Sequence, residues 1–408
     1  MVATPSRIRS RPAVLILVLG CLTAVTPLTI DMYVPGFPAM STALHTSGAA
    51  VQLTMTAFLA GLVAGQVVIG PLSDGIGRRG LMIGGAAGYI ALALVCAFAP
   101  DVGVLIGARF LQGVAAAAGM VLARAVITDH FDGPDIPRYF ALLSQILGVA
   151  PVVAPVLGGA ILSFATWRTI FGVLSAVGVL LLIGVLAKVP ESLPRERRHQ
   201  GGLSGTFRAM GRLARDRPFV GFVLVLGLSS AALFTYISGS SFVFERIHGV
   251  SPSVFSLIFA VNSVGIIASG AVFSRLSRRY RLNTLLTAAV AVSGTGVLAQ
   301  VVATALFGEV FAVTWICLFV FTWSIGMITP AAMSLGQSLG RGASGAASAL
   351  LGGLQFTFGA AASPLVGLFG ATSSLPMAVI MLVALALAAV ALAALVRPRE
   401  GHGEFAAD

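Results

Sequence analysis

The feature that most constrains the fold is a series of twelve apolar segments, each long enough to cross a lipid bilayer. A transmembrane helix needs about 20 apolar residues. Only 10% of this chain is charged, against about 25% in soluble domains. The expected segments are 13–35, 49–71, 80–99, 102–126, 138–163, 168–188, 218–240, 252–273, 283–305, 308–330, 345–370 and 374–396. The sequence therefore predicts an all-α integral membrane protein with twelve transmembrane helices.

The basic residues fall almost entirely on one side of this predicted topology. With the N-terminus in the cytoplasm, 22 of the 25 Lys and Arg residues lie in cytoplasmic segments, and the exceptions are Arg109, Arg168 and Arg246. This is the positive-inside pattern of membrane proteins. Topology and anionic lipid thus explain the net charge of +11, and no nucleic-acid partner is expected. Both termini are expected in the cytoplasm, with 13–30 as part of an uncleaved first span.

A polar connection at 189–217 divides the segments into two sets of six. Its sequence PESLPRERRHQGG is charged and rich in turn residues, so we expect a solvated cytoplasmic linker. It separates an N-terminal half, 1–188, from a C-terminal half, 218–396, and a cytoplasmic tail follows at 397–408. GPLSDGIGRR after the second segment is weakly echoed by VFSRLSRRYR after the eighth. Two related, pseudo-symmetric six-helix halves are typical of transporters that alternate access around a central site.

The cysteine and histidine residues give no indication of a cofactor or a metal site. The three cysteines lie in apolar segments, and no two of the five histidines have the spacing of metal ligands. The predicted membrane segments contain no acidic pair, and the chain has no large soluble domain. We therefore expect no cofactor, and the sequence does not support a membrane-embedded enzyme.

The loop after the second segment reads GPLSDGIGRR and resembles the loop G-x-L-x-D-R-x-G-R-R of the major facilitator superfamily. Glycines allow a tight turn there, and Asp74 can pair with Arg78 or cap a neighbouring helix. Gly75 stands where the pattern has a basic residue, so one charge contact is missing. The resemblance implies a role in conformational gating for five residues: Gly70, Asp74, Gly77, Arg78 and Arg79.

The fourth segment contains RFLQG at 109–113, which resembles the superfamily pattern R-x-x-Q-G. An arginine inside a membrane helix costs several kcal/mol unless it is paired or hydrated. The resemblance implies that Arg109 takes part in proton coupling. The open alternative is that its side chain reaches the outer interface, because it lies about seven residues from the start of the segment.

The fifth segment contains APVLGG at 154–159, which resembles the antiporter pattern G-P-x-x-G-G. Small residues let two helices approach closely, and proline provides a bend. Ala154 stands where the pattern has glycine. Together with the other motifs, this segment favours antiport over symport. The residues that carry the resemblance are Gly148, Pro155, Gly158 and Gly159.

An aspartate stands near the end of the first segment, in the stretch LTIDMYVPGFP. Asp31 and Pro35 match the D-x-x-x-P pattern at the end of the first span of drug antiporters. The other thirteen acidic residues lie in loops or near predicted helix ends, and Glu309 is the next nearest to a membrane segment. Burying an unpaired carboxylate is costly, so such a residue marks a functional site by default. The alternative is that Asp31 lies at the outer interface, solvated or capping a turn.

These four motifs lie in the N-terminal half and carry a resemblance that covers nearly the whole chain, to the twelve-span drug:proton antiporters of the bicyclomycin and chloramphenicol resistance (Bcr/CflA) type. The resemblance implies the major facilitator fold and proton-coupled efflux of drugs or small amphipathic compounds across the bacterial cytoplasmic membrane. Asp31 and Arg109 would couple the proton, because their predicted depths match and the family fold brings their spans together. A dedicated exporter of one endogenous metabolite or sugar, and a proton-coupled importer, remain alternatives. A monomer is expected.

Aromatic residues are concentrated after the sixth segment, where 21 of the 33 lie. Aromatic walls with a few polar groups suit bulky, weakly polar ligands. Each aromatic residue could instead face lipid, and each polar residue could bond a neighbouring helix. The candidates for contact with a drug-like substrate are Tyr33, Gln112, Tyr236 and Asn262.

Overall fold

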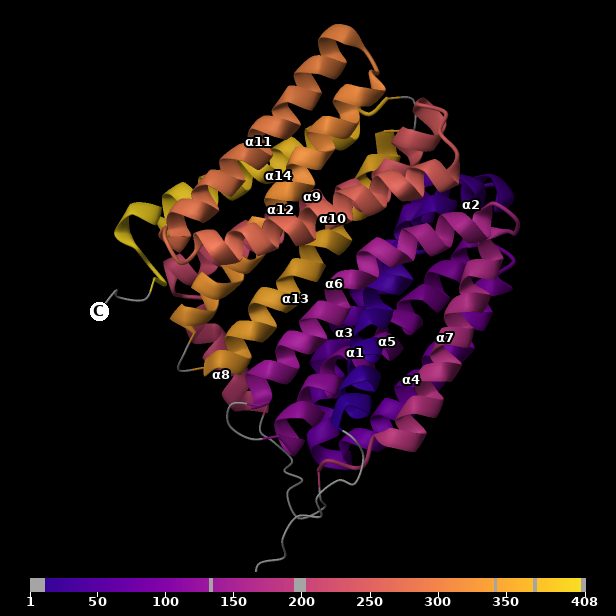
Figure 1. Cartoon of the computed structure of the whole chain (residues 1–408), viewed down its shortest axis with the longest axis vertical. Helices are drawn as coiled ribbons and strands as arrows, with labels where there is room; N and C mark the ends of the chain where they lie inside the picture. The colour runs from indigo at the N-terminus through magenta and orange to yellow at the C-terminus, as the bar shows by residue number, and fades with distance from the viewer. Residues whose placement is uncertain (1–11, 132–134, 194–202, 341–342, 370–372, 405–408) are drawn as a thin grey trace, which may run out of the picture.

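The computed structural model describes residues 12–131, 135–193, 203–340, 343–369 and 373–404, which form helices joined by turns (Figure 1). Twelve helical segments in these ranges are long and apolar enough to span a membrane, which confirms the predicted number. The N-terminal half contains α1 (Pro12–Asp31), η1 (Val34–Gly36), α2 (Phe37–Ala43), α3 (Gly48–Ile76), α4 (Arg78–Ala97), α5 (Val102–His130), α6 (Asp135–Leu162) and α7 (Trp167–Lys188). The rest of the chain contains α8 (Leu203–Leu213), α9 (Arg217–Ser241), η3 (Phe242–Ile247), α10 (Pro252–Leu276), α11 (Leu282–Phe307), α12 (Phe311–Leu339), α13 (Ser344–Ala362), η5 (Ser363–Phe369), α14 (Leu375–Ala391), η6 (Leu392–Val396) and η7 (Pro398–Glu400).

The helices form two bundles that share one packing plan. In each bundle the third span packs against the sixth: α4 against α7 in the first, and α11 against α14 in the second. The bundles lie side by side, and they meet where α6 contacts α10 and where α3 contacts α13 and η5 (Figure 1). We call the end that carries α8 the linker end, and the opposite end, which carries α2, the far end.

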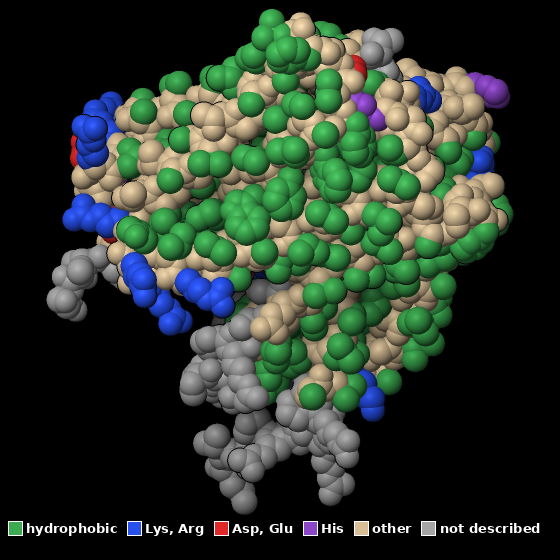
Figure 2. Space-filling model, turned by 45° about the horizontal axis from the view of Figure 1, so that its top comes forward, with side chains coloured by type: hydrophobic (Ala, Val, Ile, Leu, Met, Phe, Trp, Pro, Cys, Tyr) green, Lys and Arg blue, Asp and Glu red, His purple; other side chains and the backbone are tan. Residues whose placement is uncertain are grey.

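The outer surface of the bundles is apolar, as expected for helices in contact with lipid. Figure 2 shows hydrophobic side chains over much of the visible face, with Lys and Arg side chains gathered toward its edges. Leu180 and Ile183 of α7 and Val390 of α14 are among the large exposed apolar side chains. Soluble monomers rarely expose apolar surface on this scale, so the surface fits a chain embedded in a bilayer.

The first span is longer than predicted and is broken in its middle. α1 ends at Asp31, and η1 and α2 extend the span to Ala43 rather than ending it at 35. Pro35 and Pro38 occupy first-turn positions of η1 and α2, where a missing N–H group costs nothing. The prolines therefore begin new helical turns instead of marking the end of the span, and Asp31 lies well inside it.

Two further expectations about the organisation of the chain need correction. The seventh span continues through η3 to Ile247 rather than ending at 240, and this places Glu245 within the span. The connection at 189–217 was expected to be entirely solvated, but its helix α8 packs against α13 and its residue Glu191 binds the start of α4. Leu213 at the end of α8 packs against the hydrophobic core.

The hydrogen bonds between the two bundles of the described chain lie at the far end. Gln52 of α3 is fully buried and donates from Nε2 to the carbonyl oxygen of Ser238 in α9 (3.0 Å). Its Oε1 accepts from the N–H of Gly367 in η5 (2.9 Å). Arg246 of η3 donates to the hydroxyl of Ser41 in α2 (2.5 Å). These contacts hold the bundles together at the end remote from the linker.

Candidate functional site

Asp31 lies inside the protein, at the point where the first span breaks. Its side chain is 4% exposed, and its Oδ1 has no hydrogen-bond partner among the described residues. The short helix η1, which follows Asp31, contacts α9 and α10 of the other bundle. The structure therefore places Asp31 at a buried interface and not at a solvated outer rim.

Arg109 of α5 is fully enclosed by aromatic side chains. Its guanidinium carbon lies 4.4 Å from the ring centroids of Tyr33 and Phe58, and 5.7 Å from that of Phe171. Such cation–π contacts stabilise an arginine that is removed from water. Nη1 also donates to Oε1 of Gln112 (2.8 Å). An arginine held in this way does not reach the outer interface, so the structure does not support that alternative.

Asp31 and Arg109 do not form an ion pair in this structure, contrary to the pairing that their matched depths suggested. Nη2 of Arg109 donates instead to the backbone carbonyl of Thr29 (3.3 Å), whose hydroxyl shares a hydrogen bond with Tyr89 (2.6 Å). Residues two apart on a helix point to different sides. Arg109 thus fixes the end of α1 from one side, while the Asp31 carboxylate lies on another. The proton-coupling role of both residues stays a prediction.

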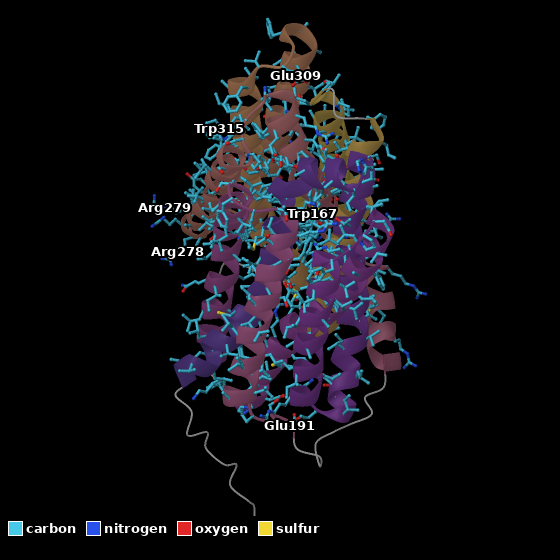
Figure 3. The ribbon with its side chains drawn as sticks, turned by 90° about the vertical axis from the view of Figure 1, so that its right-hand side faces the viewer. Trp167, Glu191, Arg278, Arg279, Glu309 and Trp315 are labelled. Carbon is cyan, nitrogen blue, oxygen red and sulfur yellow. The ribbon has the colours of Figure 1, made fainter. Side chains whose placement is uncertain are left out.

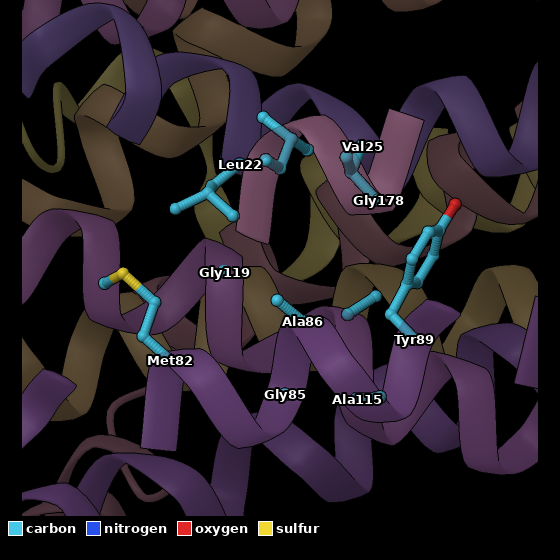
Figure 4. A pocket seen from close by; sticks show the side chains of 11 residues that line it. Leu22, Val25, Met82, Gly85, Ala86, Tyr89, Ala115, Gly119 and Gly178 are labelled. Carbon is cyan, nitrogen blue, oxygen red and sulfur yellow. The ribbon is translucent and has the colours of Figure 1, made fainter. Parts of the chain in front are cut away.

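A small apolar pocket lies inside the N-terminal bundle beside this site (Figure 4). It is lined from α1, α4, α5 and α7, largely by small residues such as Gly85, Gly119 and Gly178. Tyr89 is the only lining residue with a hydroxyl, and that hydroxyl is already bonded to Thr29. A pocket within one bundle and without a free polar group has nothing to orient a polar substrate.

The two substrate candidates of the C-terminal bundle are in direct contact with each other. Nδ2 of Asn262 in α10 donates to the phenol oxygen of Tyr236 (2.9 Å), and Nε1 of Trp315 in α12 donates to Oδ1 of Asn262 (3.2 Å). The rings of Phe259 and Phe321 pack on Tyr236, with centroids at 5.6 and 6.2 Å. Sequence reasoning placed Trp315 only among the aromatic residues of its span.

The two substrate candidates of the N-terminal bundle surround Arg109. Tyr33 is fully buried and its hydroxyl shares a hydrogen bond with Thr54 (3.2 Å), while Gln112 binds the guanidinium. The structure thus divides the four candidates into two groups, one in each bundle. Phe58 and Phe171, which complete the enclosure of Arg109, carried no sequence signal beyond being aromatic.

The glycine pair of the predicted antiporter motif lies where three helices meet. A Cβ atom on Gly158 would clash with the backbone carbonyl of Met32, in the break that follows Asp31. A Cβ atom on Gly159 would clash with Ser256 of α10, in the other bundle, and its carbonyl accepts from Ser253 (3.2 Å). Glycine is needed at both positions because α6 approaches the neighbouring backbone closely.

The other two residues of that motif have looser surroundings. Pro155 is buried inside α6, which also contains Pro151. A Cβ atom on Gly148 would meet nothing within 4 Å. Close packing therefore explains Gly158 and Gly159 but not Gly148.

The predicted gating loop joins several spans of the N-terminal bundle. Arg78 donates from Nη1 to Asp74 (2.6 Å) and from Nε to Asp129 at the end of α5 (3.0 Å). Gly77 adopts φ = 106°, a conformation that favours glycine. Arg79 donates to the carbonyl of Leu186 in α7 (2.9 Å). Gly70 makes no close approach of this kind, since its nearest contact would be 3.9 Å away.

A glutamate after the last span of each bundle binds the start of the third span. Glu191 accepts from the backbone N–H of Arg78 (2.9 Å) and of Arg79 (3.3 Å), at the beginning of α4. Glu404 accepts from the backbone N–H of Asn283 (3.0 Å), at the beginning of α11. Carboxylates at helix N-termini compensate unsatisfied N–H groups. Sequence reasoning missed both contacts because it treated the two segments as solvated.

Two further acids have clear positions in the structure. Figure 3 shows Glu309 at the far end of the molecule, opposite Glu191. In the same view Arg278 and Arg279 point outward from the ribbon. Oε1 of Glu309 accepts from the backbone N–H of Ser374 (2.7 Å) and thereby caps α14. Glu245 is partly buried in η3, and its Oε1 has no hydrogen-bond partner in the described chain. Glu245 is thus a second interior acid, which the predicted limit at 240 concealed.

We predict that the substitution Gln52→Leu opens the far end. It removes two hydrogen bonds between the bundles, each worth about 0.5–1.5 kcal/mol. Distance measurements between spin labels at the exposed residues Thr42 and Phe307, one in each bundle, should then show a larger share of separated far ends. Gln66→Leu is the matched control, since Gln66 of the same helix donates a hydrogen bond to Met120 of its own bundle. Equal effects of the two substitutions would contradict the prediction.

Comparison with known proteins agrees with this architecture. The sequence pattern described as the Major Facilitator Superfamily matches residues 19–364. The chain belongs to the Major Facilitator Superfamily. Within the superfamily it is 39% identical over 386 residues to the "Uncharacterized MFS-type transporter YdgK" of Bacillus subtilis, covering 94% of this chain and 96% of that protein. It is 30% identical over 364 residues to the "Bicyclomycin resistance protein homolog" of Haemophilus influenzae, covering 89% and 91%.

A solved structure of the same superfamily shows the same fold. A bacterial homolog of the human lysosomal transporter Spinster, in an inward-facing and unoccupied conformation, matches with a TM-score of 0.72 at 14% identity and covers 97% of this chain and 99% of that one. The chain is therefore a multi-pass membrane transporter with the twelve-helix superfamily fold. The expected resemblance to bicyclomycin-type relatives is confirmed by the named homologues.

Proposed function

We propose that this transporter exports drugs or small amphipathic compounds across the bacterial cytoplasmic membrane in exchange for protons. The observation that carries the proposal is the buried Asp31 carboxylate, 4% exposed and with an unpartnered oxygen, at the interface between the bundles. A carboxylate without a partner in a membrane interior is stable only if it binds a proton or a cation. It can therefore exchange one for the other as access alternates.

The charges at the interface also favour a class of substrate. Arg109 is enclosed by Tyr33, Phe58 and Phe171, so its charge is shielded from a ligand. Asp31 instead lies beside η1, which contacts α9 and α10, the helices that carry Tyr236 and its stacked Phe259. A carboxylate near aromatic faces suits cationic or neutral amphipathic compounds better than anions.

The orientation proposed for the transport cycle follows the distribution of basic residues. If the linker end is cytoplasmic, the hydrogen bonds of Gln52 and Arg246 close the outer side. Asp31 would release its proton and bind substrate in this arrangement. It would take up a proton and release substrate when the far end opens.

The names of relatives support efflux. One is called a bicyclomycin resistance protein homolog. Another is the "Multidrug resistance protein MdtL" of Salmonella heidelberg. The two sequences are 29% identical over 242 residues, which cover 59% of this chain and 61% of that protein. The packing of Gly158 against the break beside Asp31 adds a structural link between the antiporter motif and the proposed proton site.

Drug susceptibility of an efflux-deficient bacterium tests this proposal. Expression of the wild-type chain should raise the inhibitory concentrations of several unrelated compounds, such as ethidium, tetraphenylphosphonium and chloramphenicol. Expression of Asp31→Asn to the same membrane level should not. Protection against a single compound would favour a dedicated exporter, and accumulation of a compound inside the cells would favour an importer.

A further inference from the structure

Helix α8 (Leu203–Leu213) is held at the boundary of the membrane, at the linker end (Figure 1). A turn of three residues joins it to α9, whose span begins at Arg217. Asp216 in this turn caps α9, because its side chain accepts from the backbone N–H of Phe219 (3.2 Å). The short, capped turn leaves α8 little freedom to move away from the start of the span.

One side of α8 is packed against the protein. Ala209 is buried, and Leu213 packs against the hydrophobic core. The helix contacts α13, which in turn contacts α3 of the other bundle. Both α9 and α13 begin at the linker end. Helix α8 therefore lies beside the point where two spans leave the hydrocarbon, at the level of the lipid headgroups.

Another side of α8 carries three exposed arginines, which we call the arginine row: Arg208, Arg212 and Arg215. Residues spaced by four and three positions share one face of a helix, and these three extend over about 10 Å of its axis. Arg215 lies in the turn that continues α8, and its backbone N–H donates to the carbonyl oxygen of Arg212 (3.1 Å). The helical geometry thus reaches the third arginine.

The described part of the chain supplies no counter-charge to the arginine row. None of the ion pairs between described residues includes a member of the row. Asp216 is the only acidic residue between 203 and 217, and its carboxylate is occupied in capping α9. Basic residues clustered beside a transmembrane helix or on an amphipathic helix attract anionic lipid, and guanidinium groups form paired hydrogen bonds with phosphate.

We propose that the arginine row binds the headgroups of anionic phospholipids in the membrane leaflet at the linker end. The lipid phosphates supply the missing counter-charge and hold α8 beside α13 and the start of α9. A general attraction between basic loops and an anionic leaflet would act on every exposed cation of this end. The arginine row differs because an ordered helix aligns its three guanidinium groups on one face. This inference is independent of the transported compound and of proton exchange.

The test variant is the triple substitution Arg208→Gln, Arg212→Gln, Arg215→Gln, which removes the charge of the arginine row. All three positions are exposed, and surface substitutions of this kind usually change stability little. A second triple variant, Arg208→Lys, Arg212→Lys, Arg215→Lys, keeps the charge on a different side chain. It should retain most of the lipid binding, which separates loss of charge from disturbance of α8.

The matched control is the triple substitution Arg275→Gln, Arg278→Gln, Arg279→Gln. These residues are also exposed, and Figure 3 shows Arg278 and Arg279 pointing outward from the ribbon. They lie at the linker end of α10 and in the turn that follows it. The control therefore removes the same number of charges from the same end of the molecule but leaves α8 intact.

The measurement is thermal unfolding of the purified full chain in a neutral detergent while dioleoylphosphatidylglycerol is added in steps, with dioleoylphosphatidylcholine in a parallel series. A lipid that binds the folded chain raises the unfolding midpoint by mass action. Phosphatidylglycerol should stabilise the wild type, and phosphatidylcholine should not. The test variant should need about tenfold more phosphatidylglycerol, or more, for the same rise, because each arginine adds to the attraction. The control and the Lys variant should resemble the wild type.

Three outcomes would overturn the proposal. The first is an unchanged phosphatidylglycerol requirement in the test variant. The second is an equal loss in the test and control variants, because the total charge of the linker end would then explain the binding. The third is an equal stabilisation of the wild type by inorganic phosphate alone, because the arginine row would then bind a soluble anion and not a lipid surface.

Discussion

The substitution Asp31→Asn is expected to abolish ethidium accumulation driven by a pH gradient. Asparagine has nearly the same shape as aspartate and keeps an acceptor oxygen, but it neither binds nor releases a proton. Asp31 forms no ion pair in the structure and is 4% exposed. The substitution therefore leaves no opposite charge buried and unpaired, which is the usual reason why removing a buried charge destabilises a protein. Inside-out vesicles with an acidified lumen provide the measurement.

Glu245→Gln is the matched control for Asp31→Asn. Glu245 is the other interior acid, in η3 near the far end, and it also has an oxygen without a partner. It lies beside Arg246 and away from the break in the first span. We expect Glu245→Gln to retain most gradient-driven accumulation. The opposite pattern, with Glu245→Gln inactive and Asp31→Asn active, would move the proton site to the C-terminal bundle.

The substitution Gly158→Ala is expected to cost the protein both stability and transport. The added methyl group would clash with the carbonyl oxygen of Met32, which belongs to backbone and cannot turn aside as a side chain can. Overpacking of this kind costs about 1–3 kcal/mol. The clash falls one residue after Asp31, so relief by movement of the chain would also displace the carboxylate. Thermal unfolding in detergent and gradient-driven ethidium accumulation should both decrease.

Gly148→Ala provides the comparison within the same motif. A methyl group there meets nothing within 4 Å, and alanine is the better helix former by about 1 kcal/mol. This variant should be as stable as the wild type or slightly more so, with transport unchanged. Equal losses in Gly148→Ala and Gly158→Ala would show that close approach to Met32 is not what the motif provides.

The number of spans could be predicted from the sequence because hydrocarbon thickness sets the length of each apolar segment. The ends of spans one and seven could not. Pro35 and Pro38 suggested an exit from the membrane, but a proline in the first turn of a short helix is compatible with continued helical structure. Span seven extends into a π-helical turn that carries Glu245 and Arg246. In the sequence, two adjacent charged residues look the same as the beginning of a loop.

The candidate site was only partly accessible to sequence reasoning. A carboxylate and an arginine inside apolar segments are expensive, so Asp31 and Arg109 stood out by their positions in the sequence. Their contacts did not, because these depend on which face each side chain occupies. Thr29 and not Asp31 faces Arg109, and the rings of Phe58 and Phe171 take the place of a counter-ion. The resemblance predicted the gating loop. It did not predict that Glu191 binds this loop, because Glu191 lies in a segment whose composition indicated a solvated linker.

The most direct test of the account is whether substrate drives proton movement through Asp31. Inside-out vesicles are acidified internally, and a pH-sensitive dye reports the loss of lumenal protons when ethidium is added outside. The account predicts a burst of proton release with the wild-type chain and none with Asp31→Asn. Ethidium-dependent proton release that persists in Asp31→Asn would contradict the central claim that this carboxylate carries the exchanged proton.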